Sequence, residues 1–280
     1  MIYSASRRTD LVRFHPDWLA GRIGRARKLE AVVYWTKDPE ALVGHPGLSR
    51  VLERYPSLVH VTLTGRGGTV WEPGVRPPGE LAGPLAALAK KLPPGAVRWR
   101  FDPILLDADA PDPEAEVAAF FETARAVWRQ AFGTARETTA SFLALYPAVK
   151  RSLATAGRRV AVPDAGAKKR ILAVMLECLG QPEKKGGPPA IRLCCAADAG
   201  PVEGCGPAAC VDASTLDRLY GTRLAALPRD RGQRAACLCA QSTDIGSYRQ
   251  ECGHRCLYCY ARHAATEPQI GSCGRRLEPV

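Results

Sequence analysis

Residues 31–37 read Ala-Val-Val-Tyr-Trp-Thr-Lys, an apolar run of β-branched and aromatic side chains that ends in a hydroxyl and an ammonium group. A short continuous run of this kind, bounded by charged residues, is typical of a strand that is buried on both faces of a sheet. Five further runs share this character, namely residues 2–6, 58–64, 97–101, 139–145 and 191–195. Between them lie segments with helical spacing or helix-capping residues, of which the clearest are 81–92, 114–131 and 165–179.

Strands that alternate with helices predict an α/β protein in which a parallel sheet is covered by helices. Six such strands followed by a late one favour a TIM-barrel-like fold, a full or partial β/α barrel. An open doubly wound sheet is the alternative, although no Gly-x-Gly-x-x-Gly follows the first strand. We expect residues 1–230 to form the barrel body, and residues 231–280 to form a cysteine-rich, cluster-binding segment that completes the barrel mouth.

Polar residues gather where the predicted strands end, and the C-terminal ends of parallel strands build the active sites of α/β folds. The candidate catalytic residues are Arg7, Arg8, Asp10, Lys37, Arg100 and Asp102. We predict that the four cations hold anionic groups of a cofactor or substrate. The two aspartates would orient the arginines or bind ribose hydroxyls. For each residue taken singly, the alternative is an exposed loop charge.

The 280-residue chain carries a net charge of +11, which favours anionic partners such as nucleic acid or a nucleotide-like or other small anionic substrate. No apolar run approaches the length of a membrane helix, and the N-terminus does not resemble a signal peptide. We therefore expect a cytoplasmic protein without a membrane partner. All eleven cysteines fall at or after residue 178, and reduced thiols in that compartment favour metal binding over disulfides.

Three of the cysteines, Cys252, Cys256 and Cys259, have the spacing C-x3-C-x2-C. Three thiolates that each bind a separate iron of a 4Fe–4S cluster leave one iron open, which is what catalysis requires. A tetrahedral zinc site needs a fourth ligand, and His254 is poorly placed between the cysteines to join it. Zinc and plain thiols nevertheless remain alternatives to the cluster.

This loop, with Tyr258 before its last cysteine, resembles the cluster loop of radical S-adenosylmethionine enzymes. The resemblance implies that the three cysteines hold a 4Fe–4S cluster, and that Tyr258 belongs to the cofactor site. It also implies that the open iron binds S-adenosylmethionine, which an electron from a donor such as flavodoxin or ferredoxin cleaves to a 5′-deoxyadenosyl radical. In that superfamily the loop usually follows the first strand, whereas here it lies near the C-terminus.

Nearly the whole chain also resembles an uncharacterised family, the domain of unknown function numbered 1848. The matching stretches are residues 4–10, 35–39, 62–65, 99–103, 244–246 and 252–261. The family is noted for a C-terminal cysteine group similar to the radical S-adenosylmethionine loop, but it brings no established reaction.

The resemblance to this family extends to four more cysteines, Cys195, Cys210, Cys237 and Cys239. They would suit a second, closed site for an iron–sulfur cluster or for zinc. We expect Cys178, Cys194, Cys205 and Cys273 to lie outside both sites.

These patterns together predict a radical S-adenosylmethionine-type iron–sulfur enzyme that acts on an unidentified anionic substrate. The alternative is an iron–sulfur protein that binds or helps to repair nucleic acid without radical catalysis. A zinc-stabilised module without a redox role is a third reading. The chain has no Gly-x-Ser-x-Gly, His-Glu-x-x-His or P-loop motif.

Overall fold

The computed structural model describes residues 1–180, 188–195 and 199–261. Its centre is an eight-stranded sheet with the order β10-β1-β2-β3-β4-β6-β8-β9, in which every pairing is parallel. The strands are β1 (Ile2–Ala5), β2 (Ala31–Thr36), β3 (Ser57–Thr62), β4 (Val97–Ile104), β6 (Thr138–Phe142), β8 (Ile191–Leu193), β9 (Cys205–Pro207) and β10 (Thr243–Asp244). A separate antiparallel pair joins β5 (Leu106–Asp107) to β7 (Val160–Ala161).

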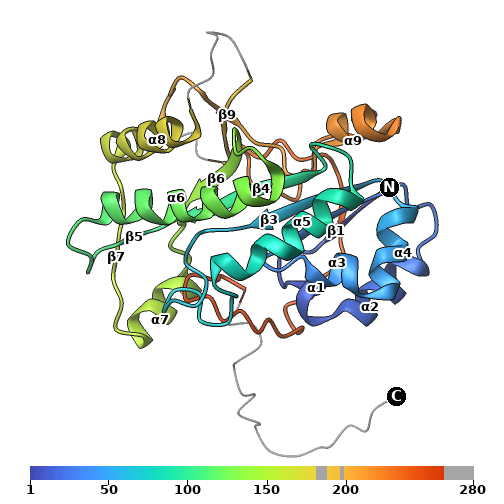
Figure 1. Ribbon diagram of the computed structural model, residues 1–280, viewed down its shortest axis with the longest axis horizontal. Helices are drawn as coiled ribbons and strands as arrows, with labels where there is room; N and C mark the ends of the chain where they lie inside the picture. Colours follow the sequence, from blue (N-terminus) through green and yellow to red (C-terminus); the bar gives the residue numbers. More distant parts are fainter. Residues whose placement is uncertain (181–187, 196–198, 262–280) are drawn as a thin grey trace, which may run out of the picture.

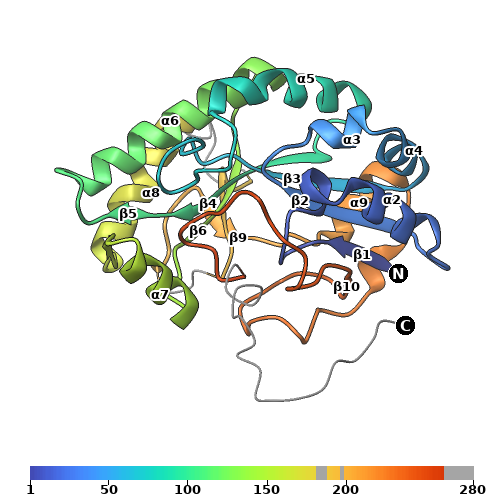
Figure 2. The same cartoon turned by 90° about the horizontal axis from the view of Figure 1, so that it is seen from below.

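Helices connect most of the strands, and α3 to α6 lie along one side of the curved sheet (Figure 1 and Figure 2). The helices are α1 (Leu11–Phe14), α2 (Pro16–Gly24), α3 (Glu40–Gly44), α4 (Pro46–Arg54), α5 (Ala82–Lys91), α6 (Pro113–Phe132), α7 (Pro147–Thr155), α8 (Ala165–Leu179) and α9 (Ala213–Tyr220). Two short 3-10 turns, Pro78–Leu81 and Leu224–Ala226, complete the described elements. No helix in the described ranges combines the length and the apolar character needed to cross a membrane.

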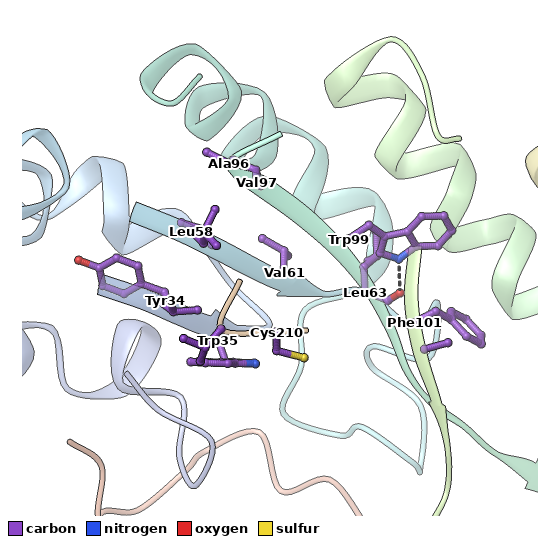
Figure 3. Close-up of a cluster of buried hydrophobic side chains, with 14 of the residues drawn as sticks. Tyr34, Trp35, Leu58, Val61, Leu63, Ala96, Val97, Trp99, Phe101 and Cys210 are labelled. Atoms are coloured by element: carbon purple, nitrogen blue, oxygen red, sulfur yellow. Dashed lines mark hydrogen bonds between the residues drawn. The ribbon is translucent and has the colours of Figure 1, made fainter. Parts of the chain in front are cut away.

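The alternation of side chains along β4 separates a packed outer face from a polar inner face. Trp99 and Phe101 point to the helical side, where both rings lie 5.0 Å from the ring of Phe121 in α6. The indole nitrogen of Trp99 donates a 2.9 Å hydrogen bond to the carbonyl oxygen of Leu63 (Figure 3). Arg98 and Arg100 therefore point to the opposite, inner face.

The structure confirms the α/β class, the six predicted strands and the three predicted helical segments. The order of the strands follows the chain from β1 to β9 without the reversal that a doubly wound sheet requires. A full barrel is wrong for the described residues, because the sheet stays open with β9 and β10 at its edges. These edge strands span three and two residues and offer few backbone groups for closure.

The C-terminal cysteine-rich segment belongs to the same sheet as the first strand. Thr243 and Asp244 of β10 pair with Tyr3 and Ser4 of β1. The predicted boundary at residue 230 stays a prediction, and residues 262–280 of the expected C-terminal segment lie outside the described residues.

Candidate functional site

The loop that carries Cys252, Cys256 and Cys259 lies against the residues that follow β1 and β3. The carbonyl oxygen of Glu251, just before the loop, accepts a 2.8 Å hydrogen bond from the His15 ring. The ring nitrogen Nε2 of His254 lies 2.8 Å from Oδ2 of Asp10. The backbone N–H of Leu257 donates to the carbonyl oxygen of Trp71 at 3.0 Å. The fold thus brings segments more than 180 residues apart to one place.

Glycine is required where the loop meets its neighbours. A Cβ on Gly74 would lie 2.0 Å from the carbonyl oxygen of Gly253, and a Cβ on Gly253 would lie 2.5 Å from the ring of Phe14. Neither approach leaves room for a side chain, so two glycines far apart in sequence allow the backbones to pack closely.

Asp10, which we expected to orient arginines, instead ties together the ends of β1 and β2 and the cysteine loop. Its carboxylate accepts hydrogen bonds from the hydroxyl of Thr36 at 2.9 Å and from the backbone N–H of Lys37 at 2.8 Å. It also caps α1 through the N–H of Arg13 and contacts His254. These partners use both carboxylate oxygens. Through His254, Asp10 contacts the cysteine loop directly.

Glu72 is the centre of a polar group that we call the Glu72 cluster, in which Glu72 and Thr64 are buried and Lys37 and Tyr258 are partly buried. The Glu72 carboxylate is 1% exposed and accepts from Lys37 Nζ at 2.9 Å, from Thr64 Oγ1 at 2.7 Å and from the Tyr258 hydroxyl. Lys37 Nζ also lies 3.1 Å from the Tyr258 oxygen. Tyr258 of the cysteine loop is thereby fixed to the ends of β2 and β3.

The electrostatics of the Glu72 cluster favour an ion pair beside a neutral phenol. Burial by itself raises the pKa of Glu72, but the Lys37 ammonium and the hydrogen bonds outweigh it and lower that pKa. Burial by itself lowers the pKa of Lys37, but the charge of the Glu72 carboxylate outweighs burial and raises it. Burial raises the pKa of Tyr258 well above its ordinary value. Lys37, expected to hold an anion of a ligand, is therefore already paired with Glu72.

The three thiols of the loop are close enough to influence one another. Cys256 is buried, whereas Cys252 and Cys259 are half-buried. Burial raises the pKa of Cys256, and the neighbouring Cys259 and Cys252 raise it further. A thiol held neutral in this way becomes a thiolate when a cationic metal centre is bound. This donor set of three sulfurs fits a cluster that keeps one iron open.

The other predicted strand-end residues have definite partners. Arg8 donates to the carbonyl oxygen of Gly246 at 3.0 Å and lies 3.5 Å from Asp244. Arg100 pairs with Asp102, which also accepts from the hydroxyl of Ser141. The guanidinium of Arg7 lies over the ring of Trp35, with its central carbon 5.1 Å from the ring centroid.

Three of the four cysteines predicted for the second site lie together with Cys194. The thiol of Cys210 contacts those of Cys194 and Cys239, and Cys239 contacts Cys237. Cys194, which we expected to lie outside both sites, thus contacts this set. Cys195 follows it with a left-handed φ of 55°, and its place in the second site stays a prediction.

Two arginines lie beside this second set of cysteines. Arg100 Nη1 lies 3.9 Å from the sulfur of Cys210, and Arg234 Nη2 lies 3.7 Å from that of Cys194. Cys178 lies on α8, Cys205 belongs to β9, and Cys273 is outside the described residues.

Within residues 1–180, 188–195 and 199–261, no group of three or more His, Cys, Asp or Glu side chains converges so as to hold a metal ion. A single ion requires ligands that meet at one point. The cysteines of a cubane cluster each bind a different iron, so their sulfurs need not converge. This finding therefore bears on a mononuclear zinc site more than on a cluster.

Glu72 was missed by the sequence analysis, since it lies in the irregular stretch between β3 and the first 3-10 turn. The only local signal is the turn-forming Pro-Gly pair that follows it.

A family model matches most of the chain. The family model described as Domain of unknown function (DUF1848) matches residues 24–261. No curated protein and no solved structure matches the chain.

Proposed function

The chain belongs to the DUF1848 family. We propose, from the placement of its cysteine loop, that it is a radical S-adenosylmethionine-type iron–sulfur enzyme that acts on an anionic substrate. The observation that carries the proposal is the docking of the Cys252–Cys259 loop on the ends of β1 to β3. There Asp10 and Glu72 hold His254 and Tyr258. In parallel α/β folds this is the end of the sheet where active sites form.

Cys252, Cys256 and Cys259 would hold the cluster. When it is bound, the cluster supplies the electron, received from a donor such as flavodoxin or ferredoxin, that cleaves S-adenosylmethionine to methionine and a 5′-deoxyadenosyl radical. The sheet is open, and its strands follow the order of the chain from β1 to β9; we interpret it as a partial barrel. The cysteine loop would then lie over the ends of β1 to β3.

The chain's own residues position the loop and shield it from water. The Lys37 ammonium, which is partly buried, lies near Cys256, where a positive charge favours the thiolate form of the ligand. The Glu72 carboxylate keeps that ammonium and the Tyr258 hydroxyl in place. Burial of Cys256 and His254 limits the access of water to this part of a site that would handle a reactive radical.

The second cysteine set would form a closed site for a second iron–sulfur cluster or for zinc. We assign it Cys194, Cys210, Cys237 and Cys239, on the contacts between their thiols. Arg100 and Arg234 would partly compensate the negative charge of four thiolates.

The test is anaerobic iron and sulfide analysis with low-temperature electron paramagnetic resonance, with and without S-adenosylmethionine. About eight irons, with one signal shifted by S-adenosylmethionine, supports both sites, and about four irons with the same shift supports the loop alone. Cys256→Ala should abolish the shift. Cys178→Ala on α8 is the matched control and should leave it intact. Zinc in place of iron, or a signal indifferent to S-adenosylmethionine, contradicts the proposal.

The net charge of +11 favours one alternative, an iron–sulfur protein that binds or helps to repair nucleic acid. Fluorescence anisotropy with a labelled DNA duplex over a series of salt concentrations tests it. Tight, salt-dependent binding without cleavage of S-adenosylmethionine would favour this alternative over the enzyme.

A further inference from the structure

Three tyrosines gather at the surface beside the cysteine loop. Tyr146, Tyr248 and Tyr260 are 44%, 42% and 44% exposed. Among the Trp, Tyr and Phe residues that the structure describes, only Trp18 on α2 is exposed to a similar extent. A single exposed ring needs no explanation, but rings that share one patch are typical of a binding surface.

Contacts join the three rings although they come from distant parts of the chain. Tyr146 precedes α7, and its ring centroid lies 5.8 Å from that of Tyr260, which follows the last cysteine of the loop. The Tyr260 hydroxyl donates a 2.7 Å hydrogen bond to the carbonyl oxygen of Arg7. Tyr248 lies in the turn after β10, within electrostatic range of Tyr260. Segments that follow β1, β6 and β10 thus meet in one surface.

Two arginines accompany the tyrosines. The central carbon of the Arg8 guanidinium lies 5.1 Å from the ring centroid of Tyr248, and Arg8 is also within electrostatic range of Tyr260. Arg234 is exposed and lies within electrostatic range of Tyr146. We call these five residues the tyrosine–arginine surface.

The charges near the tyrosine–arginine surface favour an anionic partner. The neighbouring carboxylate of Asp244 is 13% exposed and pairs with Arg8. Asp102, which lies within electrostatic range of Arg234, pairs with Arg100. The carboxylates therefore leave the positive charge of the chain, +11 in total, to attract an anion from outside.

The combination of rings and guanidinium groups selects among anionic partners. Aromatic side chains stack on the faces of nucleic-acid bases, and arginines hold the phosphates between those bases. In a duplex the base faces are covered by their neighbours, so only unpaired bases can stack on a protein ring. An acidic peptide has carboxylates for the arginines but no flat groups for the tyrosines.

We propose that the tyrosine–arginine surface binds a single-stranded nucleic acid, whose bases stack on the tyrosines and whose phosphates contact Arg8 and Arg234. This inference deepens the proposed function, and it rests on that function only in taking the strand as the anionic substrate. Because Tyr260 directly follows Cys259, a strand held here lies next to the proposed cluster site.

The experiment is fluorescence anisotropy of the purified full-length chain with labelled oligonucleotides. The probes are single strands of DNA and of RNA, about 12 nucleotides long, and a DNA duplex of the same sequence. Both kinds of single strand should bind more tightly than the duplex, and a preference between them identifies the source of the strand. Duplex binding that is equally tight, or displacement of the strand by polyglutamate at equal charge concentration, overturns the proposal.

Tyr146→Ala should weaken binding of the single strand by about tenfold, whereas Tyr146→Phe should retain it, because stacking uses the ring and not the hydroxyl. Tyr248→Ala provides a second, independent loss of a ring. Trp18→Ala removes a similarly exposed ring from α2 and is the control, with an unchanged Kd. Circular dichroism checks that each variant is folded. Wild-type Kd values in both Tyr→Ala variants overturn the proposal.

The phosphate contact of Arg8 has its own readout. Arg8→Gln should lower the slope of log K against log salt concentration by about 0.7, the value for one phosphate of a single strand. Arg50→Gln on the exposed side of α4 is the control and should keep the wild-type slope. Equal slopes in the two variants contradict the phosphate contact.

The binding assay and the paramagnetic resonance assay separate this proposal from the radical function. Preferential binding of single strands by a chain whose signal is indifferent to S-adenosylmethionine supports the tyrosine–arginine surface and contradicts only the radical function. A signal shifted by S-adenosylmethionine, in a chain that does not prefer single strands, supports the radical function and overturns the assigned surface.

Discussion

At the scale of single residues, the sequence predicted which strand ends carry polar groups but not how those groups pair. Asp10 and Lys37 lie where parallel strands predict them. Their partners His254 and Glu72 come from loops more than thirty residues away. No periodicity specifies such pairing, because it depends on how the irregular segments cross the sheet.

Glu72 gives the sharpest test at this scale. Glu72→Gln removes the buried charge that balances Lys37 and leaves the ammonium without a carboxylate partner. Breaking a buried pair in this way costs about 3 kcal/mol of the free energy of unfolding. Urea unfolding measures the change.

Glu53 provides the matched control, because it also pairs with a lysine, Lys91, but lies exposed to solvent. Solvent screens such pairs, so Glu53→Gln should leave the unfolding midpoint unchanged. Equal losses in both variants would show that burial of the Glu72 cluster has no energetic consequence.

At the scale of elements, the alternating pattern of β4 could be predicted from the sequence, whereas the segment facing it could not. Arg98 on the inner face reaches Asp212, which caps α9 through the N–H of Thr215 at 2.9 Å. Other contacts also dock the segment 208–220, among them the Tyr220 hydroxyl, which donates to the carbonyl oxygen of Ser57 at 2.9 Å. Asp212 thus couples a helix N-terminus to a strand of the central sheet.

Asp212→Asn should weaken this coupling in a pH-dependent way. Burial by itself raises the pKa of Asp212, but Arg98 and the hydrogen bonds from Thr215 outweigh it and lower that pKa. A carboxylate whose pKa is lower in the folded state stabilises the fold at pH values above the ordinary aspartate pKa of about 4. This stabilisation is lost as the pH falls through the folded-state pKa.

The difference in unfolding free energy between wild type and Asp212→Asn should therefore be about 1–3 kcal/mol at neutral pH and should vanish in acid. Urea unfolding at a series of pH values measures it. A difference that grows as the pH falls contradicts the assigned ion pair.

The contact between the loop after β3 and the cysteine loop gives a second test at this scale. Gly74→Ala places a methyl group against the carbonyl oxygen of Gly253 and should force the two backbones apart. The thiols of Cys252, Cys256 and Cys259 should then react faster with an alkylating reagent, as measured by peptide mass spectrometry.

Gly79→Ala is the control, because a Cβ at Gly79 meets no atom within 4 Å. Its alkylation rates should equal those of the wild type. Unchanged rates in Gly74→Ala would mean that the two loops are not closely packed in solution.

At the scale of the whole molecule, the strand–helix alternation correctly predicted a parallel sheet, but closure into a barrel could not be judged from it. Closure depends on the edge strands β9 and β10, which span three and two residues and have no recognisable pattern. In the sheet, β10 pairs with β1. The C-terminal segment therefore supplies the edge strand next to the first strand of the chain. The two ends of the described chain are thus mutually dependent for stability.

That dependence predicts different outcomes for two truncations. A chain that ends at residue 240 loses β10 and the contacts of His254 and Tyr258 with Asp10 and Glu72. Its urea midpoint should fall further than that of Glu72→Gln, and the uncovered apolar surface should bind a hydrophobic dye. A chain that ends at residue 261 keeps every one of these contacts, so its urea midpoint should lie above that of the chain that ends at residue 240. Equal midpoints for the two truncations would mean that the cysteine loop is only appended to the sheet, and the case for a site built jointly by strand ends and loop would be lost.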